Sequence, residues 1–242
     1  MWKLALKKFV EKYKDDKNVE AILLAGSYAV GNQNKYSDID VYIILNDNAN
    51  YQERGNILVD NYLVEYFINP IYKIKEYMYG DKRGYGGAMA NMLLNGKVIL
   101  DKNNIVDGLK QEALDMRNKI PEKDVMKYYA CWCAFDEYLA AKYNNQMQYY
   151  ICLKYLIEAY LINNAYPVPP EQKIERFFKD DEYRKKYNIG NFPDNDFNII
   201  VINCFDNPCK DNLKKLYDYV IEDGKFNINN FALRNKLNKK EG

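Results

Sequence analysis

The sequence predicts an α+β protein with two domains. The N-terminal domain, residues 1–120, carries a small mixed sheet flanked by helices, and the C-terminal domain, residues 121–242, is all helical. Short β-branched and aromatic runs mix with helical patterns up to about residue 100, and convincing strand patterns disappear after about residue 104. Pro121, directly before the longest helical pattern, marks the boundary. With 242 residues, 48% of them hydrophobic and 29% charged, the chain can bury a substantial core.

The first domain holds the predicted strands. Apolar residues at helical spacing, from Trp2 through Leu6 and Phe9 to Tyr13, predict an amphipathic helix that packs on a sheet. Short apolar or β-branched runs bounded by Gly, Asn or Pro predict strands at 19–25, 39–45, 62–68 and 97–100. Between the first two strands, the polar segment 26–37 predicts a helical turn followed by a loop. Helical patterns follow the third strand, at 71–79 and 85–95.

The second domain shows only helical spacing. Long patterns occur at 104–118, 124–144 and 146–164, the first of them leading into this part of the chain, and the segment YPVPP at 166–170 predicts a rigid turn.

Composition excludes several classes of function. Histidine is absent, which removes histidine-based triads and histidine-ligated zinc. The net charge of +1 offers no global field for long nucleic acid or anionic lipid, so neither is an expected partner. Five cysteines without CxxC pairs indicate reduced thiols, and no apolar run is long enough for a bilayer span. We therefore expect a cytoplasmic protein, with a homodimer left open.

Two aspartates in the segment LLAGSYAVGNQNKYSDIDVYIIL, residues 23–45, carry the chemistry. Asp38 and Asp40 are two residues apart at the start of a strand, so both carboxylates point to the same side. Such a pair repels itself unless a cation lies between, and oxygen ligands suit Mg²⁺ or Mn²⁺. In the Gly26–Ser27 turn, glycine permits close approach of a ligand, and the amides that begin a short helix suit phosphate oxygens.

These residues resemble the signature of the DNA polymerase beta-like nucleotidyltransferases: a hydrophobic strand, Gly-Ser, a spacer and Asp-hydrophobic-Asp. Gly26 and Ser27 fill the turn, residues 28–37 form the spacer, and Asp38-Ile39-Asp40 supplies the paired carboxylates. The form with SDIDV is similar to small bacterial members of the kanamycin and lincosamide type. The resemblance covers residues 18–100 and implies a nucleotidyltransferase domain with two Mg²⁺ ions, or Mn²⁺, and a nucleoside triphosphate, which we expect to be ATP.

The resemblance also implies a third carboxylate on a later strand. Glu65, in the middle of the strand pattern NYLVEYFINP, is the preferred candidate, although this position is commonly Asp in the family. Asp60 is the competitor, but it lies in the turn Val59-Asp60-Asn61. Asp38, Asp40 and Glu65 are thus the predicted catalytic and metal-binding residues.

Other candidates carry weaker signals. In the helical pattern 124–144, Asp136 borders an apolar stripe that includes Trp132, Phe135 and Leu139, whereas Glu137 lies on the far side. Asp136 is therefore the candidate general base from the second domain, against the alternative of a surface carboxylate. Gly26, Ser27, Ser37 and Lys173 are candidate nucleotide contacts, with Arg176 beside Lys173; the alternatives are an N-cap for Ser27 and solvated charges for the basic pair.

The expected reaction moves a nucleoside monophosphate, AMP from ATP, onto a hydroxyl of a small molecule and releases pyrophosphate. An antibiotic acceptor is one version. Two alternatives stay open: nucleotidylation of a protein target in an antitoxin-like role, and a catalytically silent nucleotide-binding module. A polymerase acting on long nucleic acid is disfavoured because the chain is short and has no basic track.

Overall fold

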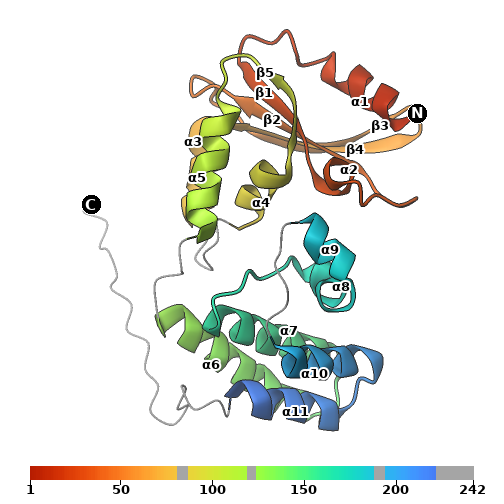
Figure 1. Cartoon of the computed structure of the whole chain (residues 1–242), viewed down its shortest axis with the longest axis vertical. Helices are drawn as coiled ribbons and strands as arrows, with labels where there is room; N and C mark the ends of the chain where they lie inside the picture. The colour runs from red at the N-terminus through yellow and green to blue at the C-terminus, as the bar shows by residue number, and fades with distance from the viewer. Residues whose placement is uncertain (81–86, 119–123, 188–193, 222–242) are drawn as a thin grey trace. The chain divides into compact units, whose positions relative to one another are not determined.

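The computed structural model describes residues 1–80, 87–118, 124–187 and 194–221. The chain divides into two compact units, residues 1–120 with 182–190 and residues 121–181 with 191–242. The predicted boundary residue Pro121 lies outside the described residues. Figure 1 shows a strand-containing unit and a helical unit.

A five-stranded mixed sheet in the order β3-β4-β2-β1-β5 forms the centre of the first unit (Figure 1). β2 and β4 are parallel, and the other neighbouring pairs are antiparallel. The strands are β1 (Val19–Leu24), β2 (Ile39–Leu45), β3 (Glu53–Val59), β4 (Tyr62–Pro70) and β5 (Lys97–Asp101). The helices of this part are α1 (Trp2–Val10), α2 (Gly26–Val30), α3 (Ile71–Gly80), α4 (Gly87–Asn95) and α5 (Val106–Asn118).

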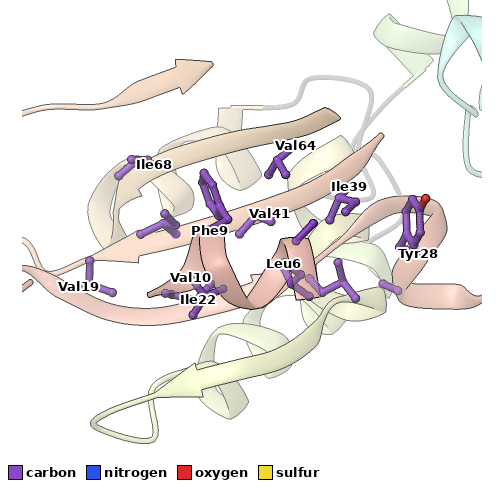
Figure 2. Packing of buried hydrophobic residues seen from close by; sticks show 14 of the residues in the cluster. Leu6, Phe9, Val10, Val19, Ile22, Tyr28, Ile39, Val41, Val64 and Ile68 are labelled. Atoms are coloured by element: carbon purple, nitrogen blue, oxygen red, sulfur yellow. The ribbon is translucent and has the colours of Figure 1, made fainter. Parts of the chain in front are cut away.

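Helix α1 covers one face of the sheet. Its residues Leu6, Phe9 and Val10 pack with alternate residues of the strands, including Val41 and Val64, and Figure 2 shows this cluster. Strand alternation sends the intervening residues to the opposite face, where a second cluster packs under α3, α4 and α5. That cluster contains Leu23, Tyr42, Ile44, Ile74, Met78, Leu93 and Leu109. Because the central strands are buried on both faces, they read as continuous apolar runs.

Strand β3 is an element that sequence analysis did not predict. It lies at the edge of the sheet and pairs with β4 alone, so its residues alternate between exposed and half-buried and form no apolar run. The turn between β3 and β4 was predicted, and there Asp60 and Asn61 have φ values of +47° and +66°. Two consecutive residues with positive φ are typical of a tight hairpin, and the Asp-Asn pair, which tolerates this conformation, was the signal in the sequence for the missing strand.

The second unit contains no strand among its described residues, in agreement with the predicted fold class. Helices α6 and α7 pack along each other, α11 packs with both of them, and α10 packs with α11 and with α8. The bounds are α6 (Asp124–Ala141), α7 (Gln146–Asn163), η1 (Glu171–Lys173), α8 (Ile174–Lys179), α10 (Asn195–Asp206) and α11 (Lys210–Ile221). Helix α9 (Asp181–Lys186) begins at the last residue of this segment, and its other residues are grouped with the first unit. Across the described residues, every helix is too short or too polar to cross a membrane.

Candidate active site

The turn after β1 lies beside the start of β2. Antiparallel pairing sets Leu24 opposite Val41, and the Ala25 N–H donates to the Asp40 carbonyl at 2.8 Å. Gly26 then begins α2 with a φ of +60°. A β-carbon at residue 26 would lie 1.8 Å from Asp40 Oδ2, so the Asp40 carboxylate occupies the space that a side chain would need. Glycine is therefore required here both by the backbone conformation and by the carboxylate.

Glu65 reaches the aspartate pair from the neighbouring strand. The parallel register of β2 and β4 sets Asp40 directly opposite Glu65, so their side chains leave the same face of the sheet. One carboxylate oxygen from each of Asp38, Asp40 and Glu65 lies within 4.8 Å of the other two, and all three residues are half-buried. This face is the one under α3, α4 and α5, because Asp40 alternates with Val41 and shares its side with Tyr42.

Arg54 on β3 compensates part of the negative charge. Its Nη2 and Nε donate to Glu65 Oε1 at 2.6 and 3.2 Å. The Arg54 side chain is 70% exposed and that of Glu65 18%, so the cation approaches from solvent onto a partly covered carboxylate. The guanidinium carbon also lies 4.9 Å from the centre of the Phe67 ring.

The pKa of Tyr28 on α2 is affected by burial and by the charge of the site. Burial raises the pKa of the Tyr28 hydroxyl, and the charges of Tyr62 and Asp38 raise it further. Tyr28 therefore stays neutral and adds no further negative charge to the carboxylate cluster near neutral pH.

The donor set fits a hard divalent cation. Three carboxylate oxygens from neighbouring strands converge without nitrogen or sulfur ligands, which is the chemistry of Mg²⁺ or Mn²⁺ sites. On the β1 side, the absence of a side chain at Gly26 leaves room for the Asp40 carboxylate. The residues present thus suit the metals that the sequence motif implies.

Asp60, the alternative third carboxylate, lies elsewhere. It occupies the hairpin turn between β3 and β4, and its carboxylate forms an ion pair with Lys8 Nζ at 2.7 Å. Of the two candidates, the structure brings Glu65 to the aspartate pair, while the ligand role of Glu65 stays a prediction.

The two candidate serines have structural contacts. The Ser27 carbonyl accepts from the N–H groups of Gly31 and Asn32, which ends the short helix α2. The Ser37 hydroxyl oxygen accepts from the Asn34 N–H at 2.9 Å and closes the loop before Asp38. Phosphate contacts by Ser27 or Ser37 stay predictions, and Ser37 has this second reason to be present.

The buried face of α6 differs in part from the predicted stripe. Cys131, which belongs to that stripe, is buried, but Trp132 and Leu139 are 40% and 38% exposed. Small residues are buried as well, namely Ala130, Ala134 and Ala141. Small side chains let two helices approach closely, and this rotates the larger ones toward solvent. Asp136 is consequently exposed and Glu137 half-buried, the reverse of the order that the stripe predicted. The general-base role of Asp136 stays untested.

The basic candidates lie at the start of α8. Lys173 is exposed at the end of η1, and Arg176 forms an ion pair with Asp180 at 2.9 Å. Both residues lie in the second unit, and their contact with a triphosphate remains a prediction.

A cavity that sequence analysis did not predict begins next to Glu65. Its volume is about 610 Å³, and it lies on the same face of the sheet, lined by Tyr42, Arg54, Phe67 and Asn69 from the sheet side. Tyr77 of α3 and Ala88, Met89 and Met92 of α4 line the opposite side. Tyr42 and Phe67 each follow a site carboxylate by two residues along their strands, and Arg54 pairs with Glu65, so the cavity lies near the carboxylate cluster. None of the three carboxylates is among its described lining residues. Its detection from sequence would have required β3, which carries Arg54.

Comparisons with known proteins gave a family match and matches to solved structures. Residues 5–82 match the family model described as a nucleotidyltransferase domain. No curated protein matches the chain. Among the solved structures that match is a nucleotidyltransferase-like protein from Exiguobacterium sibiricum 255-15, which is 10% identical, with 90% of this chain and 75% of that chain covered and a TM-score of 0.44.

The match of residues 5–82 shows a nucleotidyltransferase domain in the first unit, where the mixed sheet carries the carboxylate cluster. Its matched segment is a nucleotidyltransferase domain of the DNA polymerase beta-like superfamily, as the sequence motif predicted. A nucleotide is therefore one of its substrates.

Proposed function

We propose that this protein is a divalent-metal-dependent enzyme that transfers AMP from ATP to a hydroxyl group of a small molecule and releases pyrophosphate. The supporting observation is the convergence of Asp38, Asp40 and Glu65 within 4.8 Å, with Asp38 directly before β2, Asp40 on β2 and Glu65 on its parallel neighbour β4. Three carboxylates this close repel one another, and a bound cation would compensate their charge.

Two Mg²⁺ ions, when bound, favour ionisation of the acceptor hydroxyl and neutralise charge on the triphosphate. Asp38 and Asp40 would hold both ions, and Glu65 would complete the site on the acceptor side. Gly26 and Ser27 offer backbone N–H groups to the β- and γ-phosphates. The hydrogen bond from the Ala25 N–H fixes the Asp40 backbone, and the absence of a side chain at Gly26 leaves room for the Asp40 carboxylate.

The chain's residues account for the atoms that move. A bond forms between the acceptor oxygen and the α-phosphorus, and the bond from that phosphorus to the pyrophosphate oxygen breaks. The acceptor proton leaves to a carboxylate, for which Glu65 and Asp136 are the candidates, or to water. Lys173 and Ser37 are proposed as additional triphosphate contacts.

Pyrophosphate release tests this proposal. Each of the four ribonucleoside triphosphates is incubated with Mg²⁺ and a panel of aminoglycosides, lincosamides and other hydroxyl compounds. The blank is the Asp38→Ala/Asp40→Ala variant, and Asp60→Ala serves as a matched control because it removes a carboxylate outside the cluster.

Acceptor-dependent release that is absent from the blank and retained by Asp60→Ala supports the proposal. Nucleotide binding without release points instead to a silent module, and transfer of labelled nucleotide to a protein in place of a small molecule points to a protein target. Release that the blank retains in full would refute the roles of Asp38 and Asp40.

A further inference from the structure

The cavity beside Glu65 lies on a defined side of the carboxylate cluster. In the sheet order, β1 and the Gly26–Ser27 turn flank β2 on one side, while β4 and β3 flank it on the other. Under the proposed function, on which this step rests, phosphates bind at the Gly26 side. On the β4 side, Arg54 pairs with Glu65 and also lines the cavity, whereas Ser37 and Asp38 line a second cavity of about 570 Å³. The position of the Arg54 cavity, away from the Gly26 turn, favours the acceptor over the nucleotide as its occupant.

The walls of the cavity fit a compound with a flat apolar part. Tyr42 and Phe67 stack with ring centres 6.0 Å apart and an interplanar angle of 24°, and they face Met89 and Met92. Methionine side chains adapt to irregular shapes and pack well on aromatic rings. The volume of about 610 Å³ falls in the range of small-molecule sites, which is roughly 300–1,000 Å³.

Polar groups lie at defined points of this wall. The buried Asn69 amide donates to the Tyr42 hydroxyl at 2.8 Å, and the Tyr77 hydroxyl donates to Gln52 Oε1 at 3.0 Å. Both pairs are neutral. They can orient hydroxyl or carbonyl groups of a ligand without attracting either sign of charge.

The wall carries one charged residue of each sign. Among the described lining residues these are Arg54 and Glu53. The Glu53 carboxylate accepts from the Tyr66 hydroxyl at 2.6 Å, and Tyr66 packs with the cluster under α1 on the opposite face of the sheet. Arg54 lies on the cavity side, over Phe67. The cavity thus presents one cation and no free carboxylate from these residues, whereas a polycationic ligand needs several carboxylates to replace its hydration.

We propose that this cavity binds the acceptor, and that the acceptor is a neutral or anionic hydroxyl compound with a flat apolar part rather than a polycationic aminoglycoside. Arg54 holds Glu65 when no cation does. Once Glu65 ligates a cation, the guanidinium is released to bind a polar or anionic group of the acceptor.

Ligand binding to a blocked cavity tests the inference. Ala88 is exposed and lines the cavity, so Ala88→Phe fills the space without disturbing the core. The matched control is Leu114→Phe, which adds a ring at another exposed helix position outside the cavity. Saturation-transfer NMR with Mg²⁺ and without nucleotide measures three probes: kanamycin as the polycation, chloramphenicol as the neutral compound, and 4-hydroxyphenylacetate as the anion.

The neutral or the anionic probe is expected to bind the wild type, to bind Ala88→Phe at least about tenfold more weakly, and to bind Leu114→Phe as it binds the wild type. Preferential binding of kanamycin, binding that Ala88→Phe leaves unchanged, or failure of both other probes to bind would each overturn the inference. Pyrophosphate release with the bound probes is then measured. If binding depends on Ala88 but no release follows with any nucleotide, the proposed transfer fails and the charge preference of the cavity stands.

Discussion

Replacement of Gly26 by alanine separates the geometry of the site from the stability of the fold. Gly26 and Gly31 begin and end the same short helix, with φ values of +60° and +69°. An L-residue in this left-handed region costs about 1–2 kcal/mol. Each alanine substitution should therefore lower the free energy of unfolding by about that amount and the melting temperature by roughly 2–8 °C.

The two glycines differ in what surrounds them. A β-carbon at Gly31 meets nothing within 4 Å, whereas one at Gly26 lies 1.8 Å from Asp40 Oδ2. Ordinary contact begins at 3.4 Å, so the oxygen must move by 3.4 − 1.8 = 1.6 Å. A functional site tolerates displacements of only about 0.5 Å. Gly26→Ala should thus weaken binding of Mn²⁺ at least about tenfold and abolish turnover, while Gly31→Ala retains both.

Two measurements check this comparison. Thermal denaturation with and without Mg²⁺ reports the stability of each variant and the stabilisation that the metal adds. Titration with Mn²⁺ followed by electron paramagnetic resonance reports affinity directly. The reasoning is refuted if Gly26→Ala binds Mn²⁺ as tightly as Gly31→Ala does, or if Gly31→Ala loses as much affinity as Gly26→Ala.

Three further predictions concern single side chains. Glu65→Gln should weaken Mn²⁺ binding and abolish turnover, whereas Asp60→Asn should leave both intact. Because the exposed ion pair of Asp60 with Lys8 is weak, Asp60→Asn should change the free energy of unfolding by less than about 1 kcal/mol. Mn²⁺ titration and urea denaturation measure these effects, and weaker Mn²⁺ binding in Asp60→Asn than in Glu65→Gln would make Asp60 the ligand. Without nucleotide, Arg54→Gln should raise the affinity for Mg²⁺ about two- to fivefold, because the guanidinium no longer competes with the cation for Glu65. Calorimetric titration measures this affinity, and an unchanged value would argue against such competition. A thiol reagent applied to the native protein at pH 8 should modify the exposed Cys209 first and the buried Cys131, Cys152 and Cys204 slowly, as measured by mass spectrometry. Burial raises the pKa of the three buried thiols, to about 11 for Cys204, and keeps them protonated. Rapid labelling of any of these three would contradict their burial.

Hydrophobic periodicity and local residue chemistry predicted the central strands, which are buried on both faces, and the helix α1. The strands with Ile22 and Ile43 are continuous apolar runs, and the α1 helix has a single apolar stripe, so both were predictable without tertiary information. The spacing of Asp38 and Asp40 on a strand likewise set their common direction.

Edge elements and helix rotations were beyond such patterns. β3 is half exposed and pairs on one side, so its sequence lacks the apolar run that identifies a central strand. The buried face of α6 depends on which residues let α7 approach closely. The buried face of α6 is therefore set in part by alanines, which contribute little to an apolar stripe, and Trp132 lies toward solvent.

The sequence by itself determined the class of enzyme and the aspartate pair, because both depend on residues that are near one another in the chain. The resemblance already implied Glu65 as the third carboxylate. The tertiary structure alone decided that Glu65 lies directly opposite Asp40, that Arg54 pairs with it, and that Arg54 lines a cavity. These contacts depend on the order and register of the strands. Strand order and register arise from packing between segments that are distant in sequence, and no local pattern of residues encodes them.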